Sequence, residues 1–293
     1  MTGFFNVYKE ADYTSHDVVA IVRKLTRGKA GHTGTLDPQA EGVLPICLGR
    51  ATKLADMITG QEKSYVAEVM LGVLTDTGDM TGQVSSQPPV RFDKETIRKV
   101  VEGFCGEQLQ VPPMYSALKI GGKKLYELAR KGETVERNPR LVNISAIRVL
   151  DCCPEKNSFT IDVTCSKGTY IRSLCMDIGE ALGTGAAMGA LLRTRSGAFV
   201  LDSAVKIAQI REAAAEGSLA KMILPVEKVL PFPRAYVKPE GLAMARNGNP
   251  LPFGLVDMPV SAESKVWLHG PDGLIGLFAV DSALARLRSE VML

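Results

Sequence analysis

The amino-acid sequence predicts a mixed α+β fold, followed by a small β-rich unit at the C-terminal end. Residues 65–71 and 159–165 show the period of two that is typical of strands, whereas residues 18–25 repeat apolar side chains at helical spacing. From Pro231 onwards, prolines interrupt short apolar stretches and few helical patterns remain. We therefore expect two domains, residues 1–229 and residues 230–293.

The first expected elements are a helix, a glycine-rich loop and a second helix. Ser15 is a candidate N-cap, Asp17 suits the first helical turn, and the apolar side chains of residues 18–25 form one face of the helix. Residues 27–42 contain four glycines and many turn-forming residues, which indicates a loop. A short helix is expected around residues 51–59, directly before a glycine that suits its end.

Helices and strands then alternate along the chain. Asp93 is a candidate N-cap for a helix whose apolar face runs from Ile97 to Phe104, and another helix is expected over residues 171–182. The pattern of residues 202–217 indicates a helical connector between the two expected domains.

Composition excludes several classes of protein. The longest apolar runs are far shorter than the roughly 20 residues that span a bilayer, and no secretory signal pattern opens the chain, so we expect a cytoplasmic protein without a membrane role. The six cysteines form no CxxC pair and there are only three histidines, so neither a zinc site nor a redox motif is indicated. Buried free thiols are expected instead.

Positive charge is concentrated in one part of the sequence. The formal net charge of +3 is weak support for a polyanionic partner. Residues 119–148, however, carry eight Lys or Arg against three Glu, whereas residues 230–293 carry six of each sign. A basic surface is therefore expected in the first domain, and a neutral one in the second.

The glycine-rich loop contains one carboxylate, Asp37, within the octapeptide Gly31-His32-Thr33-Gly34-Thr35-Leu36-Asp37-Pro38. Glycines allow a ligand to approach the backbone, and a residue before proline is pushed toward extended geometry, which would present Asp37 as a nucleophile. An ordinary Asp-Pro turn explains the octapeptide's chemistry about equally well. A phosphate-binding P-loop is less favoured, because no Lys-Ser/Thr pair follows the glycines.

The octapeptide resembles the signature of the TruB-type family of pseudouridine synthases. Further blocks that are similar to family motifs follow in the expected order, at residues 9–19, 63–65, 71–79, 111–130, 165–174 and 190–199. Three positions depart from the family pattern: Glu10 replaces a proline, Asp12 stands where a glycine falls, and Leu192 stands where arginine is common. The resemblance covers roughly residues 4–230, and the tail more loosely resembles PUA-like RNA-binding domains.

This resemblance implies a pseudouridine synthase fold, with a mixed, mainly antiparallel central sheet flanked by helices. It also implies an activity: isomerisation of uridine to pseudouridine at position 55 in the T-loop of tRNA, without a cofactor or metal. The reaction must break an N-glycosidic bond, rotate the uracil and form a carbon–carbon bond. Attack at the sugar C1′, attack at the pyrimidine C6 and elimination to a glycal are all open routes.

Three catalytic residues follow from the resemblance. Asp37 is the expected nucleophile, and Arg172 in the block Thr169-Tyr170-Ile171-Arg172 is expected to pair with it and keep it ionised. Taken alone, an arginine followed by a helical pattern would more often lie on the surface. Tyr65 is expected to stack on the uracil and to accept or relay the C5 proton.

Substrate binding by this family requires the uridine to be flipped out of the RNA loop. By resemblance, His32 fills the space that the flipped base leaves. Tyr170 is expected to hydrogen-bond near the uracil or the Asp37 carboxylate, and Leu191 to form an apolar wall that retains the freed base.

RNA recognition is expected to rest on phosphate contacts from a basic, thumb-like segment of about residues 119–148, together with the shape of the folded T-arm. The expected backbone contacts, weaker than the catalytic assignments, are Lys119, Lys123, Lys124, Arg130, Lys131 and, outside the segment, Arg193. The neutral tail should add only modest contact. We expect a monomer that needs no protein partner.

Three alternatives remain at this stage. The chain could be a non-catalytic tRNA-binding or folding module on the same scaffold, or a metal-dependent phosphohydrolase that uses Asp37, Asp76 and Asp79. It could also be a related synthase that works only within a guide-RNA particle on ribosomal RNA. The compact chain lacks long charged extensions, which favours the stand-alone enzyme.

Overall fold

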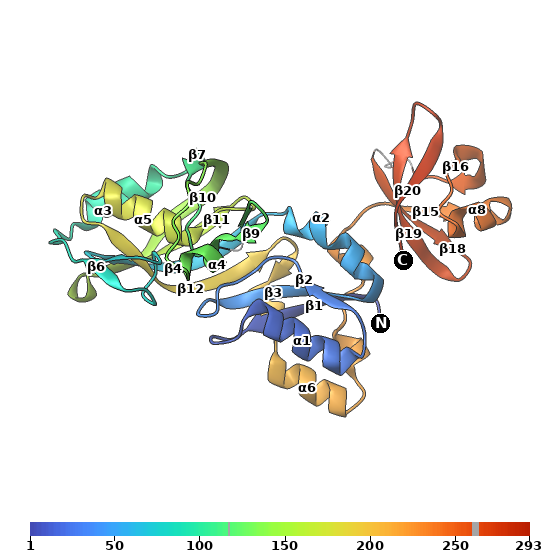
Figure 1. The fold of residues 1–293 in the computed structure, drawn as a ribbon. Helices are drawn as coiled ribbons and strands as arrows, with labels where there is room; N and C mark the ends of the chain where they lie inside the picture. Colours follow the sequence, from blue (N-terminus) through green and yellow to red (C-terminus); the bar gives the residue numbers. More distant parts are fainter. Residues whose placement is uncertain (117, 260–263) are drawn as a thin grey trace.

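The computed structural model of the protein describes residues 1–116, 118–259 and 264–293 (Figure 1). Within these residues, ten strands form one sheet, with the order β14-β1-β3-β12-β4-β11-β10-β7; β2 pairs with β3 and β13 with β12. The strands of this sheet are β1 (Gly3–Lys9), β2 (Ala30–His32), β3 (Glu41–Leu48), β4 (Lys63–Leu71), β7 (Gly106–Gln110), β10 (Arg140–Cys153), β11 (Ser158–Cys165), β12 (Ala186–Ser196), β13 (Phe199–Val200) and β14 (Val205–Lys206).

The large sheet is mixed and mainly antiparallel, as predicted. Only the pairs β1–β14 and β3–β12 are parallel among its described pairings. Two pairs of helices flank it (Figure 1): α1 (Ser15–Thr26) contacts α6 (Ile207–Ala215) near β1, and α3 (Lys94–Glu102) contacts α5 (Ile171–Ala181) near β10 and β12. The remaining described α-helices are α2 (Ala55–Thr59), α4 (Leu125–Ala129), α7 (Val226–Val229) and α8 (Leu242–Arg246). Two small hairpins complete the list: β5 (Leu74–Thr75) pairs with β6 (Val84–Ser86), and β8 (Lys119–Ile120) pairs with β9 (Lys123–Lys124).

The start of α1 differs by one residue from the prediction. Thr14 is the N-cap: its hydroxyl accepts the Asp17 N–H at 3.1 Å, and the Asp17 carboxylate accepts the Thr14 N–H at 2.8 Å. This reciprocal capping box satisfies two backbone N–H groups and outweighs the alternative cap at Ser15. Ser15 lies inside the helix and is buried. Because Thr14 caps the helix, the Ser15 hydroxyl is free to bind another segment.

Two other sequence patterns lead to different structures from those predicted. Residues 202–217 do include a helix, α6, but β14 pairs with β1 and α6 packs against α1, so this stretch completes the large sheet rather than connecting two domains. The thumb-like segment begins and ends earlier in the sequence than predicted. Residues 140–148 belong to β10, where backbone pairing with β7 and β11 holds them in the sheet.

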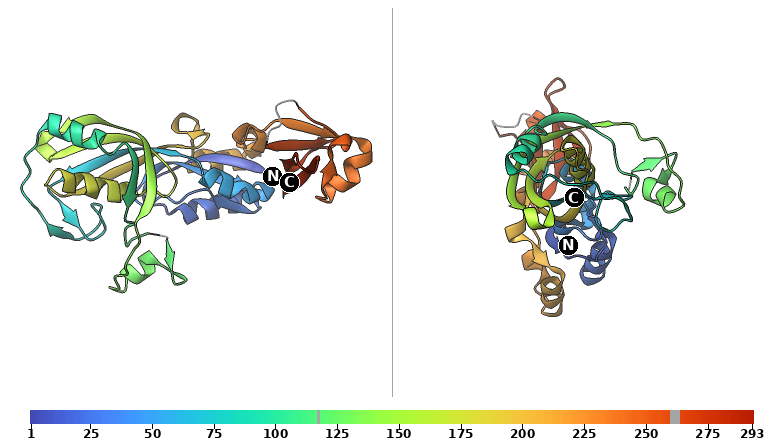
Figure 2. Two further views of the ribbon diagram at one scale, coloured as in Figure 1. Left: turned by 90° about the horizontal axis from the view of Figure 1, so that it is seen from above. Right: turned by 90° about the vertical axis from the view of Figure 1, so that its left-hand side faces the viewer.

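The thumb segment, residues 112–116 and 118–139, projects from the body of the protein (Figure 2, green). It contains the β8–β9 hairpin and α4, whose Leu125 and Leu128 are buried. The Arg137 guanidinium donates a hydrogen bond to the Pro112 carbonyl at 3.1 Å and so joins the two ends of the segment. A basic projection is therefore present, although residues 140–148 are not part of it.

The C-terminal residues form a separate six-stranded sheet, which confirms the expected β-rich character. Its order is β16-β20-β19-β18-β15-β17, with β15 (Arg234–Val237), β16 (Leu251–Pro252), β17 (Val256–Asp257), β18 (Lys265–Gly270), β19 (Gly273–Asp281) and β20 (Arg286–Met292). It lies at one end of the molecule (Figure 2), and the Trp267 indole N–H donates to the Leu230 carbonyl at 2.7 Å where the two parts meet. We propose that the domain boundary lies at residues 229 and 230, because this sheet has a hydrophobic core of its own. None of the described helices is long and apolar enough to span a membrane.

One departure from the family pattern has a backbone explanation. Asp12 has a φ of 68°, in the left-handed region, where the family has a glycine. The Asp12 N–H donates to the Pro38 carbonyl at 3.0 Å, and the Asp12 carboxylate accepts from the Gln39 side chain at 3.0 Å. These contacts hold a strained conformation beside the loop that contains Asp37.

Replacement of this residue should reveal the strain. We expect Asp12→Gly to be more stable than Asp12→Ala by about 1 kcal/mol in free energy of unfolding, because both lose the Gln39 contact but only glycine tolerates the positive φ without a Cβ clash. Urea unfolding of the two variants measures this difference. Equal stability of the two variants, or greater stability of the alanine variant, would show that residue 12 carries no backbone strain.

Candidate active site

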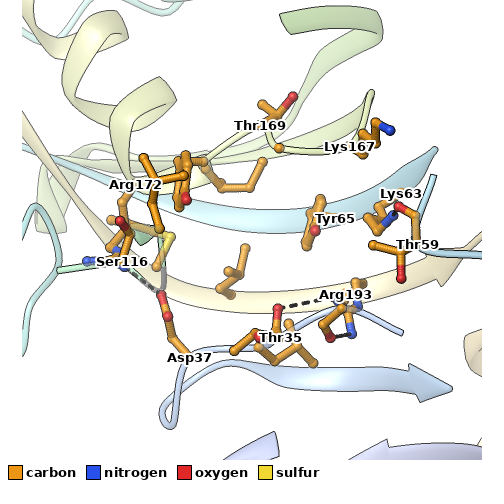
Figure 3. Close-up of a pocket in the computed structure, with 18 residues that line it drawn as sticks. Thr35, Asp37, Thr59, Lys63, Tyr65, Ser116, Lys167, Thr169, Arg172 and Arg193 are labelled. Carbon is orange, nitrogen blue, oxygen red and sulfur yellow. Dashed lines mark hydrogen bonds and ion pairs between the residues drawn. The ribbon is translucent and has the colours of Figure 1, made fainter. Parts of the chain in front are cut away.

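A cavity of about 280 Å³ lies over β4 and β12, near the middle of the large sheet. It is bounded by the glycine-rich loop before β3, the residues that lead into α5 and the base of the thumb (Figure 3). Five of the six predicted catalytic and substrate-binding residues line it: Asp37, Tyr65, Tyr170, Arg172 and Leu191. The tertiary structure therefore gathers residues that are far apart in the sequence.

The ion pair expected between Arg172 and Asp37 is present. Nη2 of Arg172 lies 3.0 Å from Oδ2 of Asp37, and the Asp37 side chain is 43% exposed while that of Arg172 is 6% exposed. The carboxylate thus faces the open cavity, and the guanidinium holds it from the protein side (Figure 3). This arrangement contradicts the alternative of a surface arginine.

Arg172 uses its guanidinium to join four groups. In addition to Asp37, it donates to the Thr77 carbonyl at 3.0 Å and to the Tyr115 carbonyl at 2.6 Å, and its Nε lies 3.7 Å from the Asp79 carboxylate. The cation therefore occupies the space between Asp37 and Asp79, where the phosphohydrolase alternative would need a metal. Among the described residues, no group of three His, Cys, Asp or Glu side chains could hold a metal ion.

The backbone on both sides of Asp37 is held by buried polar side chains. Ser15 accepts the Leu36 N–H at 2.9 Å and donates to the Leu36 carbonyl at 3.1 Å. Lys9 is fully buried and donates to the Pro38 carbonyl at 2.8 Å, and burial lowers the pKa of Lys9 to about 8. These contacts fix the residues directly before and after the carboxylate.

Arg193 also holds this loop, which corrects its predicted role. It is 1% exposed and donates to the carbonyls of Val43 at 2.7 Å, Gly34 at 3.1 Å and Thr35 at 3.4 Å. A guanidinium buried among three carbonyls cannot contact an RNA phosphate, so the prediction of a backbone contact is wrong for Arg193. Burying the charge is tolerated because each of the three guanidinium nitrogens donates to a carbonyl.

A glycine permits the close approach of Arg193 to the loop. Gly42 has a φ of +103°, and a Cβ on it would lie 2.3 Å from the Arg193 carbonyl oxygen. Gly42 and Arg193 are directly paired between β3 and β12. A side chain at residue 42 would push the glycine-rich loop away from the cavity, so the close pairing of these strands requires a glycine here.

Tyr65 and Arg193 lie opposite each other on neighbouring strands. The Tyr65 side chain is 8% exposed and lines the cavity, and burial raises its pKa, so the phenol keeps its proton at neutral pH. Leu191, two residues before Arg193 on β12, also lines the cavity. These positions fit a stacking surface and an apolar wall.

Tyr170 lines the cavity, but it makes no hydrogen bond with Asp37 among the described contacts. Its backbone N–H donates to the Gln110 side chain at 2.7 Å, and its carbonyl accepts from the same side chain at 3.1 Å. The expected contact with the Asp37 carboxylate is therefore wrong for this structure. A contact with the uracil stays a prediction.

His32 lies at the end of β2, outside the cavity wall. Its Nδ1 accepts the Gly34 N–H at 3.3 Å, and its ring meets the His16 ring edge-on with centroids 5.3 Å apart. Burial lowers the pKa of His32 to about 4, so the imidazole is neutral at pH 7. A neutral, partly buried ring fits contact with bases better than contact with phosphates.

The predicted RNA-backbone residues of the thumb remain candidates. Lys123, Arg130 and Lys131 are exposed, and Lys124 lies with its Nζ 5.3 Å from the centre of the Tyr126 ring. Lys119 belongs to β8, but its side chain lies outside the described part of the structure. Exposed cations on a projecting segment suit phosphate contacts.

Sequence reasoning missed several polar residues of the site. Lys63 lines the cavity and donates to the carbonyls of Thr59 at 2.9 Å and Gln61 at 2.7 Å; Ser116 also lines it, and its buried hydroxyl has no described partner. Both residues lie in blocks that resemble the family, which was the available signal. The sequence identifies Asp79 only as a motif residue and a candidate metal ligand, and Lys9 only as part of a motif.

Comparisons with known proteins agree with the geometry. A family model described as "TruB family pseudouridylate synthase (N terminal domain)" matches residues 22–171, and one described as "tRNA pseudouridylate synthase B C-terminal domain" matches residues 172–231. A protein of Alkaliphilus oremlandii named tRNA pseudouridine synthase B is 48% identical over 275 residues, which are 92% of this chain and 90% of that protein. A protein of the same name from Pelotomaculum thermopropionicum is 42% identical over 287 residues, 94% of this chain and 90% of that protein.

Solved structures give the same result for the fold. A chain in the crystal structure of a Cbf5-Nop10-Gar1 complex is 28% identical with a TM-score of 0.73, and the match covers 99% of this chain and 84% of that chain. The family models together span residues 22–231, and the relatives match along most of the chain at well above 30% identity. The chain therefore belongs to the TruB family of pseudouridylate synthases, as its motifs predict.

Proposed function

We propose that the protein converts uridine to pseudouridine at position 55 in the T-loop of tRNA, with Asp37 as the nucleophile. The observation that supports this most directly is the pair of a cavity-facing Asp37 and a buried Arg172 at 3.0 Å. A carboxylate held by a buried guanidinium beside an open cavity is oriented for attack on a bound base or sugar. Relatives named tRNA pseudouridine synthase B support tRNA as the substrate.

The cavity suits a uracil that has left the RNA stack. Flipping a base costs a few kcal/mol, and stacking on an aromatic ring returns roughly 1–3 kcal/mol, so Tyr65 offsets much of the cost. Leu191 closes the cavity with an apolar side chain. The uracil can then rotate without escaping after its bond to C1′ is broken.

The isomerisation is balanced without any other reagent. The N1–C1′ bond breaks, the C5–C1′ bond forms, the proton leaves C5, and N1 regains a proton. Asp37 can act at C1′, at C6 or in elimination to a glycal, and the proposal is compatible with each of these routes. Because burial raises the pKa of Tyr65, its phenol suits relay of the C5 proton rather than its permanent removal.

Recognition of the T-arm follows from charge and shape. The thumb presents Lys123, Arg130 and Lys131 to solvent beside the cavity, and phosphate contacts of this kind position an RNA without reading its sequence. We propose that His32 occupies the space of the flipped base, since its ring is neutral and partly buried. A monomeric, cytoplasmic enzyme acting without a protein partner completes the proposal.

The guide-RNA alternative has support from fold but less from sequence. The solved neighbours include chains of H/ACA particles at 26% and 28% identity, whereas the proteins named tRNA pseudouridine synthase B reach 48%. The higher identity favours the stand-alone reaction on tRNA. Activity of the isolated chain on a T-arm transcript, without any added protein, distinguishes the two.

Removal of the Asp37 carboxylate should abolish the chemistry. We expect Asp37→Asn to lower the rate of tritium release from a T-arm transcript labelled at uridine C5 by more than about 10³-fold, because the amide is a poor nucleophile, while RNA binding persists. Undiminished release by this variant would refute the nucleophile assignment.

Asp76→Asn is the matched control for this experiment. Asp76 is exposed and accepts the Gln83 N–H at 2.7 Å, and its carboxylate makes no described ion pair with the Arg172 guanidinium. We expect its variant to keep nearly full activity, with and without a chelator. Loss of activity in Asp76→Asn together with inhibition by chelator would favour the metal-dependent alternative instead.

Acid should destabilise the protein through His32. Its pKa is about 4 in the folded state and about 6.5 in the unfolded state, so the unfolded chain binds more protons between these values. The stability that neutral His32 contributes is therefore complete above pH 6.5 and lost as pH falls through 4.

A variant isolates this contribution from other titrating groups. Between pH 7 and pH 4, we expect the free energy of unfolding to fall by about 2 kcal/mol more in the wild type than in His32→Gln, after allowance for partial solvent screening. Urea unfolding at the two pH values measures the difference. Parallel losses in both proteins would mean that His32 is not held neutral by burial.

A further inference from the structure

The active-site cavity has two ends with different chemistry. Figure 3 shows Asp37, Arg172 and Ser116 at one end, Tyr65 in the middle, and Lys63, Thr59 and Lys167 at the other. The first end is the proposed site of bond exchange. The second end, formed by Lys63 and Lys167, has no role in the reaction described above.

The cavity contains more positive than negative groups. Lys63, Lys167, Arg172 and Arg193 line it, and Asp37 is the one carboxylate among its described lining residues. Asp37 is already paired with Arg172. The lysine end therefore carries positive charge without a counter-ion from the described part of the chain.

Lys63 is a buried cation that only neutral groups contact. Its side chain is 7% exposed, and its ammonium donates to the carbonyls of Thr59 and Gln61, which leaves one of its three N–H donors without a described partner. Burial, together with repulsion from Arg193 and Lys167, lowers the pKa of Lys63 to about 8. An anion beside it would satisfy the third donor and offset the cost of burying the charge.

Lys167 lies in a loop that favours an anion for separate reasons. The loop runs from the end of β11 to the start of α5, and Gly168 adopts a φ of +83° with open space where a Cβ would lie. The backbone N–H groups of Lys167 and Gly168 have no acceptor within the described residues, and Tyr170 provides no side-chain cap for α5. Free N–H groups before an uncapped helix N-terminus attract negative charge.

From these contacts we propose that Lys63, Lys167 and the loop at Gly168 form a subsite for a phosphodiester group of the substrate RNA, next to the flipped uridine. The inference rests on the proposed RNA substrate. A nucleotide whose base lies over Tyr65 and whose C1′ lies beside Asp37 leaves its flanking phosphates at the mouth of the cavity, where Lys167 is exposed. The subsite would thus anchor the flipped nucleotide by its backbone, independently of the thumb.

The first test is the salt dependence of RNA binding. The Asp37→Asn background prevents turnover, and Lys167→Met removes an exposed charge without disturbing the core. Loss of one phosphate contact should weaken binding about fivefold to tenfold at low salt and reduce the slope of log K against log salt by about 0.7 to 0.9. Lys156→Met is the matched control, because Lys156 is also exposed but lies at the opposite end of β11.

A chemical change in the RNA identifies the group that is bound. In this test, one phosphodiester beside the target uridine of a T-arm RNA is replaced by a neutral methylphosphonate. The Asp37→Asn protein should bind this RNA less tightly than it binds the unmodified RNA. The double variant with Asp37→Asn and Lys167→Met should bind both RNAs equally tightly. Equal losses of affinity for the modified RNA in both proteins would overturn the subsite. Equal salt slopes for Lys167→Met and Lys156→Met would overturn it as well.

Lys63 gives an independent readout through protons. Because its pKa is about 8, roughly half of the molecules lack this proton at pH 8, and a bound phosphate should restore it. RNA binding at pH 8 should therefore take up roughly half a proton, measured by calorimetry in buffers of different ionisation enthalpy. A folded Lys63→Met variant with the same proton uptake would contradict the proposal.

These experiments separate the subsite from the proposed reaction. Binding is measured at equilibrium, so equal salt slopes for Lys167→Met and Lys156→Met overturn the subsite whether or not Asp37 is the nucleophile. Full activity of Asp37→Asn would instead overturn the reaction and leave the binding data intact.

Discussion

The buried guanidinium of Arg172 is the group on which the rest of the site depends. It lies in the first turn of α5, where the helix dipole disfavours a positive charge, and its side chain is only 6% exposed. Asp37 and Asp79 offset that charge, and the carbonyls of Thr77 and Tyr115 accept hydrogen bonds from Nη1 and Nη2. Because breaking such a buried network leaves an unpaired charge, the four segments that meet at Arg172 are held in one arrangement.

The Asp37 loop is rigid for a related reason. Lys9 and Arg193, both buried, donate to its carbonyls, and Ser15 binds Leu36 through both backbone groups. The Asp37 carboxylate is therefore positioned by three side chains, which come from α1, β1 and β12. Such support fixes a reactive group more firmly than a surface loop can do alone. The thumb, by contrast, projects from the body and carries its cations in solvent (Figure 2).

The two ends of the cavity differ in how their charges are paired. At one end, Arg172 and Asp37 form an ion pair at the proposed site of bond exchange; at the other, Lys63 and Lys167 have no carboxylate partner among the described residues. A polyanionic substrate can supply the missing negative charge, so its binding would neutralise the two lysines. Recognition of the flipped nucleotide and recognition of the RNA arm can then be distinct steps, carried by the cavity and by the thumb.

The sequence by itself determined the local elements and singled out the carboxylate that pairs with Arg172. Period-two and helical patterns predicted β4, β11 and α5, and the motif around Asp37, with its resemblance to a family, predicted the pairing with Arg172. The first kind of signal depends on the spacing of apolar residues within one segment, and the second depends on which residue types form a motif. The tertiary structure alone decided that Arg193 is buried against the Asp37 loop, that residues 140–148 belong to β10, and that Lys63 faces the cavity. Burial and partners depend on which strands become neighbours, and spacing along one segment carries no information about that.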